Sequence, residues 1–140
     1  MTGSAATTAR RTLLRMKVLV IDPITHLRSR LVERLADAGL DVVEAGDAAT
    51  AVAALERHPI DAVVLDVPDR HSLELLADVR RGAPSATVVV ITNSLWYRRR
   101  CLDLGADHFL DKSRDLERVV EVLEVLERQL PATAGRTPRA

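Results

Sequence analysis

The sequence predicts one α/β domain, an open parallel sheet with helices packed on both of its faces. Short apolar segments alternate with helical patterns five times along the chain. The apolar segments are almost free of polar residues, as residues 62–65 (Ala-Val-Val-Leu) show, and such runs are typical of strands buried on both faces. Because crossovers between parallel strands are right-handed, the expected architecture is a doubly wound (βα)5 sandwich.

The composition fits a globular domain and argues against several other classes of protein. The chain has 140 residues, enough for one domain with a sizeable core, and its hydrophobic content of 47% includes only 2% aromatics. A net charge of zero gives no support to binding of nucleic acid or of a membrane surface. No apolar run approaches the roughly 18 residues of a membrane span, and the single cysteine, Cys101, fits a reducing cytoplasm.

The two ends of the chain differ from the part between them. Residues 1–15 and 131–140 hold five of the 20 basic residues and no acid, so residues 16–130 carry a net charge of −5. Small and polar residues dominate both ends. We therefore expect flexible tails at 1–13 and 131–140 around a single folded domain at 14–130.

The first half of the chain predicts three strands and two helices. The strands are expected at 16–21, 41–45 and 61–66, with a helix in each interval between them. Thr25 and Asp47 are predicted as the N-caps of these helices, because their side chains can accept a hydrogen bond from the first turn. Gly39 is expected to end the first helix, and the second is expected at 48–57.

The second half alternates in the same way. Ser72 is predicted to cap a helix that extends to Arg81, with leucines and a valine facing the core. The remaining strands are expected at 86–91 and 107–111, and the remaining helices at 95–104 and 114–130.

Four polar residues follow apolar strands almost immediately: Asp22, Asp66, Thr92 and Lys112. In an open parallel sheet, functional groups gather outside the carboxyl ends of the strands, so we expect these four at one edge. An aspartate can act as a nucleophile, a hydroxyl can donate to a phosphoryl oxygen, and an ammonium can neutralise its charge. Lys112 is one of only two lysines among 20 basic residues, which indicates that the function of this position requires an ammonium group rather than a guanidinium. The sequence therefore predicts a phosphoryl-acceptor site centred on Asp66.

At these positions the chain resembles the response-regulator receiver domain, over roughly residues 16–130. The resemblance implies a flavodoxin-like, five-stranded parallel sheet of order 2-1-3-4-5 and a role in bacterial two-component signalling. It implies that Asp66 accepts a phosphoryl group from a kinase phosphohistidine. It also implies that Thr92 and Lys112 are the switch hydroxyl and lysine, and that Phe109 is the switch aromatic.

The same resemblance implies a Mg²⁺ site made by Asp22, Asp66 and the backbone carbonyl of Pro68. The chain departs from the family's pattern beside this site, because Pro23 stands where a second acid is usual and has no side-chain ligand. Mg²⁺ commonly relies on one or two carboxylates, so we expect binding that is weakened rather than lost. The loops after Asp66 and Thr92 also look shorter than usual for the family.

Other polar clusters give weaker signals. The four histidines show no spacing typical of zinc sites. Residues 98–100 are three arginines, which we interpret as a solvated or partner-binding helix face rather than a nucleic-acid site. In the last predicted helix, valines at 120, 122 and 125 widen the apolar stripe beyond one core face, which indicates either a broad core contact or a homodimer or partner surface on the last two helices.

Three hypotheses for function follow. The first is a stand-alone cytoplasmic receiver that accepts phosphate from a histidine kinase or phosphotransfer protein and alters binding to a downstream protein, without acting as an enzyme beyond self-phosphorylation and dephosphorylation. The second is a degenerate receiver that serves as a phosphorylation-independent interaction module. The third, a small flavodoxin-like enzyme or nucleotide binder, has little support because the chain has no glycine-rich phosphate loop.

Overall fold

A computed structural model describes residues 15–112 and 116–130. The strands in this part are β1 (Lys17–Ile21), β2 (Asp41–Ala45), β3 (Ala62–Asp66), β4 (Thr87–Thr92) and β5 (His108–Asp111). The helices are α2 (Thr25–Asp37), α3 (Ala48–Arg57), α4 (His71–Gly82), the 3₁₀ helix η1 (Leu95–Tyr97), α5 (Arg98–Asp103) and α6 (Leu116–Gln129). The predicted tails at 1–13 and 131–140, and the predicted start of the last helix at Arg114, lie outside the described residues.

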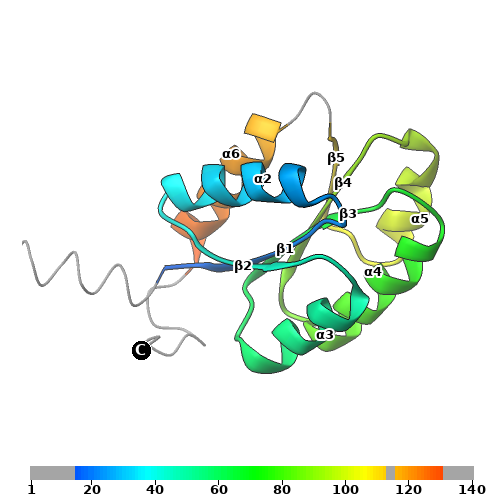
Figure 1. The fold of residues 1–140 in the computed structure, drawn as a ribbon, viewed down its shortest axis with the longest axis horizontal. Coiled ribbons are helices and arrows are strands. Elements are labelled where there is room, and N and C mark those ends of the chain that lie inside the picture. Colours follow the sequence, from blue (N-terminus) through cyan, green and yellow to red (C-terminus); the bar gives the residue numbers. More distant parts are fainter. Residues whose placement is uncertain (1–14, 113–115, 131–140) are drawn as a thin grey trace, which may run out of the picture.

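The five strands form one parallel sheet in the order β2-β1-β3-β4-β5, which confirms the predicted fold. Helices α2 and α6 cover one face, and α3, α4 and α5 cover the other (Figure 1). The central strands β1, β3 and β4 are almost wholly buried. They are apolar throughout because successive side chains of a strand point to opposite faces and both faces here are covered.

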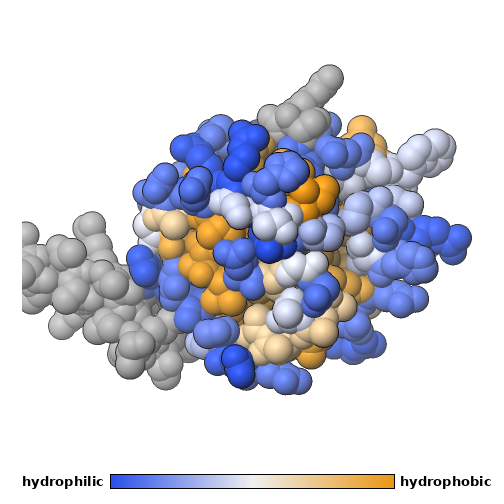
Figure 2. Space-filling model, viewed as in Figure 1, coloured by the Kyte–Doolittle hydropathy of each residue, from blue (hydrophilic) through white to orange (hydrophobic). Residues whose placement is uncertain are grey.

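The sheet divides the core into two apolar layers. Leu19, Val63 and Val88 belong to the layer under α3, α4 and α5, whereas their neighbours Val18 and Val64 belong to the layer under α2 and α6. Each fully buried valine or leucine contributes roughly 1.5–3 kcal/mol, so the paired layers supply most of the stabilisation. The edge strand β2 is only half-buried, and Figure 2 shows hydrophobic residues reaching the surface between α2 and α3, where this strand runs.

Two predicted N-caps are wrong by one or two residues. Ile24 is the N-cap of α2, and Thr25 is already the first helical residue. The N–H of Ile24 donates a hydrogen bond to Asp22 Oδ1 at 2.9 Å. Ser72 lies inside α4, and its N–H is bonded by Asp69 Oδ1 at 3.2 Å. At α4 the Asp69 carboxylate thus accepts an N–H group of the first helical turn, whereas at α2 the Asp22 carboxylate accepts the N–H of the N-cap residue itself, and in both places the hydroxyl residue lies within the first turn.

The predicted cap at Asp47 is confirmed. Its carboxylate accepts a hydrogen bond from the N–H of Thr50 at 2.8 Å, and the Thr50 hydroxyl completes a capping box. These hydrogen bonds hold the pKa of Asp47 below its ordinary value. Gly39 adopts a positive φ of 89° just past α2, as expected for a residue that ends a helix.

The helix predicted at 95–104 is divided into η1 and α5. Leu95 and Trp96 are exposed, by 64% and 91%, while only Tyr97 of this turn packs against the core. Because helices in proteins are held mainly by a buried apolar face, a first turn without one is not held in α geometry. The regular α-helix begins only at Arg98.

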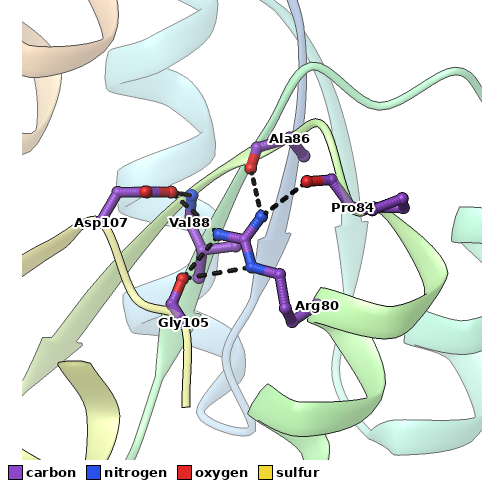
Figure 3. Close-up of polar contacts among 6 residues, drawn as sticks. All are labelled: Arg80, Pro84, Ala86, Val88, Gly105 and Asp107. Atoms are coloured by element: carbon purple, nitrogen blue, oxygen red, sulfur yellow. Dashed lines mark hydrogen bonds and ion pairs between the residues drawn. The ribbon is translucent and has the colours of Figure 1, made fainter. Parts of the chain in front are cut away.

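At the amino ends of β4 and β5, Arg80 of α4 holds the neighbouring loops together (Figure 3). Its guanidinium donates to the carbonyls of Gly105, Ala86 and Pro84, at distances from 2.6 to 3.2 Å. It also pairs with Asp107, whose Oδ2 accepts a hydrogen bond from the N–H of Val88. One side chain thus joins α4, the start of β4 and the turn before β5.

Candidate functional site

The carboxyl ends of four neighbouring strands bring the predicted residues together. Asp22 follows β1, Asp66 ends β3, Thr92 ends β4, and Lys112 follows β5. The parallel register places Asp66 beside Ile91, and the backbone N–H of Lys112 donates to the carbonyl of Thr92 at 2.9 Å. Each functional side chain is therefore fixed by a strand of the sheet rather than by a mobile loop.

Lys112 contacts both carboxylates of the site. Its Nζ lies 2.8 Å from Asp22 Oδ2 and 3.1 Å from Asp66 Oδ2. The Asp22 and Asp66 side chains are almost fully buried, and that of Lys112 is only 12% exposed. Two buried carboxylates therefore share one cation, which leaves the group with a net negative charge.

Burial raises the pKa of Asp66, because the charged carboxylate has lost its water. The nearby Lys112 ammonium lowers this pKa, the neighbouring charges of Asp22 and Asp69 raise it, and the net direction is upward. Added positive charge near Asp66, or neutralisation of its carboxylate, would therefore stabilise the folded protein.

Asp22 is held from both sides. Its Oδ1 accepts the N–H of Ile24, and its backbone carbonyl accepts a hydrogen bond from Arg28 Nη1 at 2.7 Å. Arg28 also pairs with Glu44 at 2.9 Å. Sequence reasoning missed Arg28, whose position one turn into α2 after a strand-end aspartate was the available signal.

The hydroxyl of Thr92 is engaged with the loop that follows Asp66. Thr92 Oγ1 donates to the carbonyl of Val67 at 2.7 Å and accepts a hydrogen bond from the N–H of Ser94 at 3.0 Å. Thr92 is fully buried. The hydrogen bond that the Thr92 hydroxyl donates therefore links the end of β4 to the segment after β3.

The remaining predicted residues lie around this centre. Phe109 lies on β5 and is half-buried against the core layer under α3, α4 and α5. Pro68 is exposed in the loop after Asp66, and Pro23 is exposed directly after Asp22. The structure gives no side-chain ligand at position 23.

The donor set fits a hydrated Mg²⁺ ion rather than a protein-caged metal. Among the described residues, no three His, Cys, Asp or Glu side chains gather as a metal cluster. Asp22 and Asp66 do converge, since one ammonium reaches an oxygen of each. Mg²⁺ is usually bound through one or two carboxylates with several waters, which is what this pair offers.

A cavity of about 320 Å³ opens beside the carboxylates on the α2–α6 side of the sheet. Leu27, Leu31 and Val119 contribute apolar walls, and Arg30 and Lys112 contribute cations. Arg30 is exposed on α2 and was not singled out by sequence reasoning. The cavity gives access to the site from solvent.

Other candidate residues take no part in this centre. Cys101 is buried in α5, and burial raises the pKa of its thiol, which disfavours the reactive thiolate. In α6, Val120 is buried in the core and Val122 is half-buried, so only Val125 of the three extra valines is exposed, by 41%. The broad core contact therefore accounts for most of the apolar surplus on α6. No helix of residues 15–112 and 116–130 has the length and apolar character needed to cross a bilayer.

The sheet order and the site together define a receiver domain. Residues 18–124 match the family described as response regulator receiver domain, and the chain belongs to that family. Its relatives are response regulators of two-component systems.

Individual relatives match over most of this chain. The probable transcriptional regulatory protein TcrX of Mycobacterium tuberculosis is 33% identical over 120 residues, covering 83% of this chain and 51% of TcrX. The chain thus spans about half the length of this curated relative. A response regulator from Thermotoga maritima aligns with a TM-score of 0.73 at 24% identity, covering 83% of this chain and 100% of that one. The T. maritima protein TrrA, determined in complex with Mg(2+)-BeF, aligns with a TM-score of 0.70 at 24% identity, over 79% and 98% of the two chains.

Proposed function

We propose that this chain accepts a phosphoryl group on Asp66 and thereby signals in a two-component system. The observation that carries the proposal is the position of Lys112 Nζ, 3.1 Å from Asp66 and 2.8 Å from Asp22. A cation fixed beside a buried carboxylate can stabilise the charge of a phosphoryl group as it arrives. Membership of the receiver family supports the same assignment.

The proposed donor is the phosphohistidine of a histidine kinase or of a phosphotransfer protein. An oxygen of the Asp66 carboxylate attacks phosphorus, and the new P–O bond forms while the P–N bond to the imidazole breaks. The electron pair of the broken bond returns to the imidazole nitrogen. Water later attacks the phosphorus and releases inorganic phosphate, which restores the carboxylate. The domain is then a phosphoacceptor, with at most self-phosphorylation and dephosphorylation activity.

Thr92 is proposed to report the phosphorylated state. Its hydroxyl has one proton, which it donates to the carbonyl of Val67 in this structure. To donate to a phosphoryl oxygen on Asp66, Thr92 must release Val67. We therefore expect the segment after Thr92 to move, together with Phe109 on the neighbouring strand.

Mg²⁺ is the proposed cofactor. Asp22, Asp66 and the backbone carbonyl of Pro68 would hold it, with waters completing its coordination. When bound, Mg²⁺ would supply positive charge against the phosphoryl oxygens. We expect weak binding because Pro23 adds no ligand. The complex of TrrA with Mg(2+)-BeF is in keeping with this proposal.

The test is incubation with Mg²⁺ and acetyl phosphate, followed by intact-mass measurement. We expect the mass of one added phosphoryl group in the native chain and in Asp69→Ala, which removes the exposed carboxylate of the neighbouring loop. The adduct should be lost in Asp66→Ala. An adduct that persists in Asp66→Ala, or the absence of any adduct from the native chain, would refute Asp66 as the acceptor.

The alternative function is that of a degenerate receiver, which would bind a protein partner without phosphorylation. Position 23 carries no acid, and Lys112 lies nearer to Asp22 than to Asp66, so the ammonium already balances the carboxylate that would hold a metal. A degenerate receiver that binds a protein partner without phosphorylation would keep such an arrangement. Partner binding that is unchanged by acetyl phosphate and by Asp66→Ala would establish this alternative.

The proposed setting is the cytoplasm, where histidine kinases present their phosphohistidines, and the proposed output is altered binding of a downstream protein. A homodimer through α5 and α6 is the alternative output. The structure offers α6 little exposed apolar surface for it, since Val120 is buried and Val122 half-buried. Sedimentation of the native chain with and without acetyl phosphate would separate the two outputs.

A further inference from the structure

A groove runs between α4 and α5 on the face of the sheet away from the cavity beside Lys112. It has a volume of about 430 Å³. Leu73, Ala77 and Leu104 provide an apolar floor, and the exposed residues Arg70 and Arg100 line it together with His71 and Glu74. The groove can therefore take an apolar side chain, and its two arginines outnumber its one carboxylate.

Exposed residues extend this surface into η1 and the start of α5. Leu95 is 64% exposed and Trp96 is 91% exposed, and the three arginines at 98–100 that follow are also exposed. Figure 2 shows hydrophilic side chains projecting where Figure 1 places α5. Large apolar residues beside arginines are the composition of interface hot spots. We call the α4–α5 groove, Leu95, Trp96 and these arginines the arginine–tryptophan surface.

The arginines of this surface are little neutralised by carboxylates of the described residues. In the described part of the chain, the guanidiniums of Arg70, Arg98 and Arg100 make no ion pair or hydrogen bond. Arg99 approaches Asp103 only at 4.0 Å, with both side chains largely exposed, a geometry that contributes little. By contrast, Arg28 and Arg80 are each held by a carboxylate and by backbone carbonyls.

The charge of the rest of the domain decides between two kinds of anionic partner. Residues 16–130 carry a net charge of −5, so this basic surface is local, and it suits a short acidic segment better than a long polyanion that would also run over the acidic remainder of the domain. The apolar floor of the groove also has no role in contacts to phosphates. Both features favour a protein over a nucleic acid.

We propose that the arginine–tryptophan surface binds an acidic segment of a partner protein. The segment places an apolar side chain on Leu73 and Leu104 and carboxylates against Arg70 and Arg100. Trp96 covers the seated side chain from the edge of η1. Guanidinium groups suit this role because they pair carboxylates through two parallel hydrogen bonds.

A hydrogen bond beside Asp66 links the two chain segments that carry this surface. Arg70 lies in the loop that follows Asp66, and Trp96 lies in the segment that follows Thr92. The bond from Thr92 Oγ1 to Val67 O, 2.7 Å long, ties these two segments together. Phosphorylation that draws Thr92 away would change the width of the groove. This regulatory part rests on the proposed function, whereas the docking itself does not.

The test is fluorescence anisotropy with a labelled amphipathic peptide of glutamate and leucine. Its controls are the same peptide with lysine for glutamate and a labelled thymidine oligonucleotide. We expect the acidic peptide to bind at least about tenfold more tightly than either control. Arg70→Gln, Arg100→Gln and Trp96→Ala should each weaken it about tenfold, while the matched Arg118→Gln on α6 should leave it unchanged.

Three outcomes would overturn the proposal. The first is equal binding of the acidic and basic peptides, or equal effects of Arg100→Gln and Arg118→Gln. The second is preferential binding of the oligonucleotide. The third is concentration-dependent self-association that Trp96→Ala abolishes, because the occupant would then be a second copy of this chain. Asp66→Asn separates the two proposals: it should leave peptide binding intact without acetyl phosphate and remove only the response to it.

Discussion

The ammonium of Lys112 lies closer to Asp22 than to Asp66, at 2.8 Å against 3.1 Å. The lysine therefore serves the carboxylate proposed for the metal at least as much as the proposed phosphoacceptor. Pro23 leaves no further acid at this point. Lys112 is thus the cation that balances both carboxylates. Removing Lys112 should lower the stability of the fold, whereas neutralising Asp66 should raise it.

Removing the shared cation should be strongly destabilising. Lys112→Met leaves two buried carboxylates without their shared cation, and we expect a loss of about 3 kcal/mol in the free energy of unfolding at neutral pH. The loss should shrink as the pH falls, because protonation of the carboxylates removes their repulsion. Urea denaturation measures both effects. Lys17→Met is the matched control: within residues 15–112 and 116–130, Lys17 pairs with one partly exposed carboxylate, that of Asp41 at 3.3 Å, so its loss should cost less.

Restoring an acid beside Asp22 should strengthen metal binding. Pro23→Asp adds a third carboxylate at the site, and we expect the dissociation constant for Mg²⁺ to fall by about tenfold. The measurement is the increase in unfolding free energy with Mg²⁺ concentration, which reports binding to the folded state. Pro23→Ala removes the ring without adding a ligand and should bind as the native chain does. Equal affinities of the two variants would show that position 23 does not face the metal.

The raised pKa of Asp66 predicts a specific dependence of stability on pH. Burial raises this pKa above the ordinary value of 3.8, so the folded state takes up the proton at a higher pH than the unfolded state does. The contribution of Asp66 to stability is therefore complete below that ordinary value and is lost as pH rises through the raised pKa. Asp66→Asn cannot ionise, and in EDTA at neutral pH it should be more stable than the native chain by roughly 1 kcal/mol.

The pH series supplies its own control. The advantage of Asp66→Asn should disappear at acidic pH, where the native carboxyl is protonated. An advantage that stays constant from acidic to neutral pH would mean that the variant stabilises through packing rather than through charge. An Asp69→Asn variant, whose carboxylate is exposed and bonds Ser72, should show no such advantage at neutral pH.

The parts of this protein that the sequence predicted are those that depend on periodicity. Uninterrupted apolar runs located the central strands, and a polar residue directly after such a run marks the point where the chain leaves the core. That is why the sequence alone places Asp22, Asp66, Thr92 and Lys112 at one edge of the sheet. Their strand ends are adjacent in the sheet, so the convergence followed from the fold class.

The parts that the sequence did not predict depend on loops. A hydroxyl residue before a helical pattern is a good cap by itself, but both helices begin before the hydroxyl residue, where an upstream carboxylate accepts the N–H of Ile24 in one case and of Ser72 in the other. Arg80 could not be recognised either. Its partners Gly105 and Asp107 become neighbours only when two separate connections lie side by side.

The Arg80 contacts give the last prediction. Gly105 has a positive φ of 108°, and a Cβ there would lie 2.9 Å from Arg80 Nε. Gly105→Ala should therefore cost both backbone strain and loss of the Arg80 contacts, about 3 kcal/mol in the free energy of unfolding. Gly39→Ala is the matched control, because Gly39 also has a positive φ but open space around its Cβ, and it should cost about 1 kcal/mol.

A double-mutant cycle separates strain from lost contacts. Arg80→Met alone leaves the carbonyls of Ala86 and Gly105 without their donor, and we expect a cost of about 2 kcal/mol by urea denaturation. In the Arg80→Met background, Gly105→Ala should cost no more than Gly39→Ala does in the native chain, since only backbone strain remains. Fully additive costs would mean that Arg80 moves aside without loss and that its hydrogen bonds do not hold the turn before β5.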